Sequence, residues 1–487
     1  MKRPAGSFGL MDDAASPTDQ SADEPLKPNR LPGINLVLTM FMSLYGFWFA
    51  SGRTWNPDAI DKLGLGSEFF YWSQAKSLVH GQVFTVTPKQ WWIECFTIAA
   101  KCYGYFGVAP SIVRIPAVLL VGNSFVGLVP LFVALAIGLG FWSAMDLVRQ
   151  VLDQYRERHP TVSASLAARW LVVAGALLGP GSVLVLLARG RVYEEAGAWC
   201  AAFLILTLNL VYRWSRSRSN SCLYGAILTG SMATLSRPSA IPAVAVLGIA
   251  VVVIAWPWGG AKVRLLGVGL SIVPAALFVA IFVRKFGSLS FPWHTYSPYL
   301  VFPTFRETIL SDHFSTVGIR FILTTLANYL RPDSIRIHFG APWVTLKSIR
   351  PSDLIILPPV TSRQVWGYRV PSLTNVMPGP FVLTCIALVS QAGLVIKRKL
   401  RGVALMPAFM LFAGLAGGVP LITYYAVAGR YLGDVYALMA VGTAFSLPTI
   451  LDYSRRDRWS SRCVFPLVVL TAVASCFVLY QIRDSVF

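Results

Sequence analysis

A series of long apolar segments constrains the fold of this chain more than any other feature. A helix needs roughly 20 apolar residues to cross the hydrocarbon core of a bilayer. Because no water is available there to bond the backbone, each such segment is expected to be a helix that satisfies its own N–H and C=O groups. About eleven segments meet this requirement: 32–50, 112–143, 170–188, 196–212, 222–236, 239–256, 265–283, 379–396, 403–427, 432–450 and 464–481. The sequence therefore predicts an all-α polytopic membrane protein. The second segment is too long for one straight crossing, so we expect part of it to tilt or to lie along the interface.

The composition supports a membrane protein, because the chain carries too little charge to cover a water-soluble surface. Apolar residues make up 55% of the chain and charged residues only 13%, about half the usual share. The net charge of +20 comes without a nucleic-acid-binding motif, which favours a basic membrane protein over a nucleic-acid partner. Most of the seven cysteines lie in apolar runs. The spacing of Cys95 and Cys102 in a loop matches no metal site, so we expect neither a zinc module nor a disulfide framework.

Basic residues in the short connections predict the orientation of the chain. Seventeen Lys and Arg residues lie in the connections of one side and four in those of the other, and the richer side is expected to be cytoplasmic. Residues 1–31 resemble a disordered tail rather than a cleavable signal, and this tail is then cytoplasmic. An odd number of spans places the C-terminus outside.

Two connections, 51–111 and 284–378, are much longer than the rest, and both fall on the outer side. The first lies within an N-terminal transmembrane module, 32–283, and the second separates that module from the C-terminal transmembrane helices, 379–487. Long loops held by a rigid scaffold often carry function, so we expect the chemistry to be extracytoplasmic. The stretch 315–330 predicts a surface helix in the second loop.

The first outer loop contains a candidate catalytic acid. From Ser67 onward, apolar residues recur at helical spacing and predict an amphipathic helix on the membrane surface. Glu68 lies on its first turn. A partly desolvated carboxylate there is suited to act as a base or to hold a metal, whereas an ordinary acid at a helix N-terminus is equally consistent with the pattern. After Pro88 we expect a second half-buried helix, a glycine-rich turn and then an Arg-Ile-Pro step at Arg114.

This order of features resembles the GT-C superfamily of integral membrane glycosyltransferases. The chain is most similar to the bacterial branch that contains protein mannosyltransferase and aminoarabinose transferase relatives. The resemblance implies an enzyme of the bacterial cytoplasmic membrane that passes a sugar from a polyprenyl-phosphate carrier to an acceptor outside. It also implies a catalytic acid in the first outer loop, where the family often has an Asp-Glu pair. Ser67-Glu68 stands at that place, so Glu68 is the first choice of base, with Asp58 and Asp61 as substitutes.

A second acidic site is indicated by Glu194 and Glu195, which follow Arg189 and Arg191 in a tight outer turn. Charges so close to hydrocarbon are costly and tend to be kept for function, and the resemblance places a second acidic position here. A cap in which Arg simply pairs with Glu remains the alternative. Some relatives use a divalent cation such as Mg²⁺ or Mn²⁺, which Glu194 or Glu195 would be able to ligate. The sequence leaves the metal open.

Arginines at the outer ends of later spans are candidates for binding the donor phosphate. Arg430 and Tyr431 lie beside Asp434, and an Arg there can hold a phosphate oxygen through two parallel hydrogen bonds. Arg191 and Arg237 are weaker candidates. For Arg237 we favour simple snorkelling out of the span.

We therefore expect an inverting membrane glycosyltransferase with a polyprenyl-phosphate sugar as donor and an extracytoplasmic glycan, lipid or protein as acceptor. The sequence contains no P-loop, dinucleotide-binding fingerprint, zinc-protease motif or nucleophile elbow, which disfavours the enzymes built on them. Two alternatives stay open. One is a transporter or flippase of lipid-linked saccharides, and the other is an inactive GT-C-like scaffold.

Overall fold

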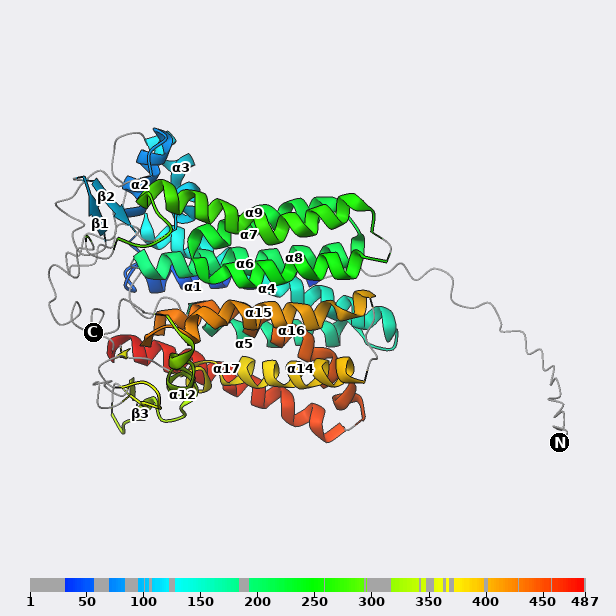
Figure 1. Ribbon diagram of the computed structural model, residues 1–487. Helices are drawn as coiled ribbons and strands as arrows, with labels where there is room; N and C mark the ends of the chain where they lie inside the picture. The colour runs from blue at the N-terminus through cyan, green and yellow to red at the C-terminus, as the bar shows by residue number, and fades with distance from the viewer. Residues whose placement is uncertain are drawn as a thin grey trace, which may run out of the picture.

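The computed structural model forms one long bundle of helices, with small elements gathered at one end (Figure 1). The bundle helices are α1 (Leu31–Ala50), α4 (Val129–Arg158), α5 (Ala164–Val183), α6 (Val192–Ser217), α7 (Asn220–Ser236), α8 (Ile241–Ala255), α9 (Ala261–Phe286), α14 (Pro378–Ile396), α15 (Met406–Ile422), α16 (Gly433–Arg456) and α17 (Arg458–Ser485). The structure describes residues 31–56, 70–83, 95–99, 101–104, 107–121, 128–183, 192–257, 259–292, 295, 317–340, 343–346, 354–361, 365–367, 372–397, 402–427, 429–456 and 458–485.

Within these ranges, nine helices are long and apolar enough to cross a membrane. They correspond to α1, α4, α5, α6, α8, α9, α14, α15 and α16. The spans formed by α8 and α15 also include the short turns that precede these helices, η3 (Pro238–Ala240) and η7 (Gly402–Leu405). The chain is an integral membrane protein, and the predicted all-α polytopic fold is confirmed.

The bundle has a buried centre and an apolar outer surface. α4, α6 and α16 are mostly buried inside the protein, whereas less than a quarter of the apolar window of α1, α9 or α14 is buried, as in helices that face lipid. A polar cluster joins α4 to α6 within the centre. The buried carboxylate of Asp146 accepts hydrogen bonds from Asn209 at 2.9 Å and from Arg213 at 2.7 Å, so the buried charge is paired and satisfied.

The predicted segment 112–143, too long for one straight crossing, is divided between two helices in the structure. α3 (Ala109–Val121) and α4 are separate helices, and α3 lies with the small elements at the end of the bundle (Figure 1). The 30 residues of α4 extend about 45 Å at 1.5 Å per residue, so α4 is long enough to cross by itself. The apolar segment 112–143 therefore includes the boundary between α3 and α4, which hydropathy alone does not reveal.

The first long connection contains a helix where the sequence predicted one, α2 (Phe70–Val79), which packs against α3 and has six of its ten residues buried. The prediction of a second helix after Pro88 is wrong for residues 95–104. These residues form a hairpin in which β1 (Cys95–Ile98) is antiparallel to β2 (Lys101–Gly104). Cys95 and Cys102 are disulfide-bonded, so the expectation of no disulfide is also corrected. The pairing of the strands brings the two cysteines together, which their spacing in the sequence does not reveal.

The second long connection lies at the same end of the bundle as the first (Figure 1). It contains η5 (Ile319–Phe321), α12 (Ile322–Leu330), the antiparallel pair β3 (Ile335–Ile337) and β4 (Val344–Leu346), and α13 (Leu373–Val376). The helix expected over 315–330 is thus present from residue 319. A parallel pair, β5 (Trp366–Gly367) and β6 (Ala426–Val427), ties this connection to the chain that follows α15.

Candidate functional site

A buried ion pair links the start of α6 to α3. Glu194 and Glu195 lie on the first turn of α6, where the helix dipole favours negative charge. Arg114 Nη2 donates to Glu195 Oε2 at 2.8 Å, and Arg114 Nη1 bonds the other carboxylate oxygen. The two side chains are 2% and 1% exposed. This bidentate pair joins segments 81 residues apart and fixes the middle of α3 against the start of α6.

Aromatic rings enclose the same guanidinium. Its carbon lies 4.2 Å from the ring centroid of Phe132 and 5.5 Å from that of Tyr71. Burial, and then the negative charge of Glu195, raise the pKa of Tyr71 well above its ordinary value. Tyr71 therefore remains a neutral phenol with a proton to donate. Its helix is held to α3 by a buried hydrogen bond of 2.7 Å from Ser111 to Gln74.

A second ion pair connects α7 to α16. Arg237 is the C-cap residue of α7, and its Nη1 donates to Asp434 Oδ1 at 2.9 Å. The guanidinium carbon lies 5.3 Å from the ring centroid of Tyr431, which belongs to η8 (Gly429–Leu432). Arg237 thus has a carboxylate partner, which the snorkelling expected of it did not require. The Arg237 side chain is still 20% exposed, against 5% for Asp434.

Charges from both ion pairs act on Tyr71. The charges of Arg237 and Glu194 both act on Tyr71 through space, together with those of Glu195 and Arg114. Close packing of the first connection on α7 supports this arrangement. A Cβ added at Gly107 would lie 1.7 Å from the carbonyl oxygen of Leu235, so only glycine permits this approach. We call Tyr71, Arg114, Glu194, Glu195, Arg237, Tyr431 and Asp434 the ion-pair cluster.

Several expected site residues fall outside the part that the structure describes. Asp58, Asp61 and Glu68 lie between Asn56 and Phe70, and Arg191 immediately precedes α6. The backbone of Arg430 lies in η8, but its side chain is not among those described. Glu68 precedes α2 by two residues in the sequence, and Tyr71 on the first turn of α2 is in the ion-pair cluster.

The sequence interpretation did not select Arg114 or Tyr71 as site residues. For Arg114 a signal was present, because a lone charge in the apolar run 109–121 is costly unless it has a partner. Tyr71 has no comparable signal, since an aromatic residue on an apolar helix face is ordinary packing.

The chemistry available to the cluster is that of paired acids and arginines. Arg237 presents a guanidinium suited to a phosphate oxygen, and Tyr71 supplies a neutral donor. The described residues include no group of three His, Cys, Asp or Glu side chains placed to hold a metal ion. A cation site on Glu194 would therefore need ligands from beyond the described ranges.

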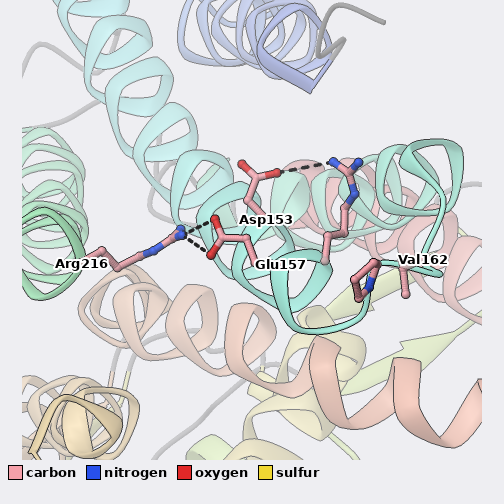
Figure 2. Close-up of a pocket in the computed structure, with 6 residues that line it drawn as sticks. Asp153, Glu157, Val162 and Arg216 are labelled. Carbon is pink, nitrogen blue, oxygen red and sulfur yellow. Dashed lines mark hydrogen bonds and ion pairs between the residues drawn. The ribbon is translucent and has the colours of Figure 1, made fainter. Parts of the chain in front are cut away.

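A pocket of about 460 Å³ lies at the opposite end of the bundle, where α4 turns into α5. Figure 2 shows its charged lining. Arg216 makes two hydrogen bonds to Glu157, at 2.7 and 2.9 Å, and Arg156 lies 3.9 Å from Asp153. These charges neutralise one another across an open surface, whereas the ion-pair cluster is enclosed and lies beside the long connections.

Comparison with known proteins identifies a likeness of fold. No protein-family model and no curated protein matches the chain. The oligosaccharyltransferase of Archaeoglobus fulgidus in its apo form is similar, with a TM-score of 0.50 and 15% identity over 93% of this chain and 56% of that one. The same enzyme with an inhibitory peptide and a dolichol-phosphate gives a TM-score of 0.47 at 14% identity.

This chain spans little more than half the length of that enzyme. At such low identity the likeness shows the fold alone.

Proposed function

We propose that the chain is a GT-C membrane glycosyltransferase that moves a saccharide from a lipid-phosphate carrier to an acceptor at the end of the bundle that carries α2, α3 and α12. The observation that carries this proposal is a cluster of acids and arginines, drawn from separate helices, on a fold shared with an oligosaccharyltransferase. Fold alone does not define an activity, so the argument depends on what the cluster can do.

In the proposed reaction an acceptor hydroxyl oxygen attacks the anomeric carbon of the donor. A new oxygen–carbon bond forms as the bond from that carbon to the phosphate oxygen breaks, and direct displacement inverts the anomeric centre. Glu68, or Asp58 or Asp61 in its place, takes the proton of the hydroxyl. The phosphate leaves with the bonding electron pair, so negative charge accumulates on it.

Arg237 is the best-supported group to stabilise the leaving phosphate, with Arg430, Tyr431 and Arg191 as further candidates. Its carboxylate partner Asp434 holds it 2.9 Å away, so little reorganisation is required when charge develops. Glu195 is committed to Arg114, which assigns it to positioning α3 rather than to reacting. Glu194 then remains as the second acidic position.

We propose that this end of the bundle faces the outside of a bacterial cytoplasmic membrane. The excess of basic residues in the connections of the other end supports this orientation. The disulfide between Cys95 and Cys102 supports it independently, because disulfides persist in oxidising compartments and are rare in the cytosol. The carrier is then a polyprenyl phosphate, and the sugar and acceptor are to be determined.

The test is transfer of radiolabel from a panel of polyprenyl-phosphate sugars by purified protein in lipid nanodiscs. We expect Glu68→Gln to lose about 10²- to 10⁴-fold in rate while retaining donor binding. Glu157→Gln, in the charged pocket at the other end (Figure 2), is the matched control and should transfer normally. Full transfer by Glu68→Gln, Asp58→Asn and Asp61→Asn would refute the carboxylate base.

A different result would favour the other functional classes. Donor binding without transfer, across all donors and with glycan, lipid and peptide acceptors supplied, would support a flippase or a scaffold. A flippase would move a fluorescent lipid-linked saccharide across the bilayer of proteoliposomes, and a scaffold would not.

A further inference from the structure

Helix α12 is amphipathic in the opposite sense to a helix on a soluble protein. Thr324, Thr325 and Asn328 are buried, although their side chains are polar. Leu323 is 58% exposed, and Ile319, in the turn that leads into the helix, is 84% exposed. The polar face of α12 thus points into the protein and its apolar face points out.

The inward polar face is bonded to the protein's own backbone. The Thr324 hydroxyl accepts from the N–H of Leu357 at 2.9 Å and donates to the carbonyl of the same residue at 3.2 Å. Asn328 donates to the carbonyl of Ile355 at 2.8 Å and accepts from its N–H at 3.1 Å. Rotating α12 to bury its leucines would break these four bonds, so its outward apolar face is a stable feature.

The strand pair β3–β4, which follows α12 in the sequence, exposes a second set of apolar side chains. Ile337 is 81% exposed, and Phe339 in the connection between the strands is fully exposed. Trp343, next to β4, is about half exposed. Large apolar side chains exposed in such number on a small structure indicate a contact surface.

Both parts adjoin exposed apolar surfaces of the bundle. Gly318 donates its N–H to the carbonyl of Thr423, just past the end of α15, at 2.8 Å, and Val419 on the last turn of α15 is exposed. β4 packs against α17, which exposes Leu470 and Phe477 among other apolar side chains. Exposed apolar side chains are therefore present on α15 and α17 where these helices adjoin α12 and the strand pair.

We propose that α12 and the β3–β4 pair lie in the interfacial layer of the bilayer, with their apolar side chains among the upper acyl chains of glycerophospholipids. Burial of such side chains at the headgroup boundary is favourable, and tryptophan, here Trp343, is enriched in that layer. This placement sets the depth of the second long connection relative to the membrane. It does not depend on the proposed enzymatic activity.

The test is photocrosslinking of the full chain in nanodiscs with p-benzoylphenylalanine placed at Leu323 or at Phe339. Leu470 on α17 serves as the lipid-facing control, and the exposed Ser219 between α6 and α7 as the water-facing control. We expect mass spectrometry to find phospholipid adducts at Leu323 and Phe339 in yields comparable to that at Leu470. The adduct yield at Ser219 should be much lower.

Two outcomes would overturn the proposal. Adduct yields at Leu323 and Phe339 as low as at Ser219 would place both parts in water. Crosslinks to another polypeptide, with little lipid adduct, would show that the apolar surface binds a protein, either a second copy or a different chain. Normal thermal unfolding of each substituted protein confirms that the fold is intact before the adducts are compared.

Discussion

Replacing Glu195 by Gln removes one charge of the buried pair and leaves Arg114 uncompensated. With side chains only 2% and 1% exposed, water is unable to take the place of the lost carboxylate. Two charge-assisted hydrogen bonds are involved, each contributing about 1.5–3 kcal/mol, and breaking a buried pair from one side costs about 3–5 kcal/mol. We expect Glu195→Gln to lower the free energy of unfolding by that amount.

The assay is reversible unfolding of the purified protein in mixed micelles with increasing SDS, followed by tryptophan fluorescence. Arg114→Gln should be destabilised similarly, and the double variant should lose less than the sum of the single losses, because each single change already breaks the pair. Glu157→Gln is the matched control, since Glu157 is 63% exposed in its pair with Arg216 and such pairs contribute about 0–1 kcal/mol.

Two results would refute this reasoning. A loss in Glu195→Gln no larger than in Glu157→Gln would show that the pair contributes little. Strictly additive losses in the double variant would show that the two side chains act independently.

Three further outcomes are expected. Gly107→Ala should lower the thermal unfolding midpoint, because the added Cβ would lie 1.7 Å from a carbonyl oxygen of α7, whereas Gly393→Ala, with nothing within 4 Å, should not lower it. Cys95 and Cys102 should react with a maleimide of high mass only after reduction of the denatured chain, and labelling without reductant would contradict the disulfide. Because burial raises the pKa of Tyr71 above its ordinary 10.0, the unfolded chain deprotonates first in alkali. The stability that Tyr71 contributes is then fully present below pH 10 and is lost above it. The thermal unfolding midpoints of wild type and Tyr71→Phe should therefore differ by a constant amount below that pH, and above it the midpoint of wild type should fall relative to that of Tyr71→Phe. A constant difference at every pH would contradict the burial of the phenol.

Local patterns in the sequence were sufficient for the elements whose environment is lipid. The thickness of a bilayer fixes how many apolar residues a helix needs, so hydropathy alone located most of the bundle helices. The helix α2 followed from the spacing of its apolar residues in the same way. Where the environment was mixed, local patterns failed. The run 112–143 concealed the end of α3 at Val121, and the segment around Cys95 formed a hairpin in place of a helix.

The sequence by itself thus determined that the chain is a polytopic membrane protein with two long connections and charged residues at the ends of its spans. Only the tertiary structure decided which charges meet. Arg114 pairs with Glu195 and Arg237 with Asp434 across 81 and 197 residues, and α12 turns its polar face inward to the backbone at Ile355 and Leu357. The physical reason is that a buried charge or polar side chain must find a partner, and the nearest partner in space is set by helix packing rather than by position along the chain.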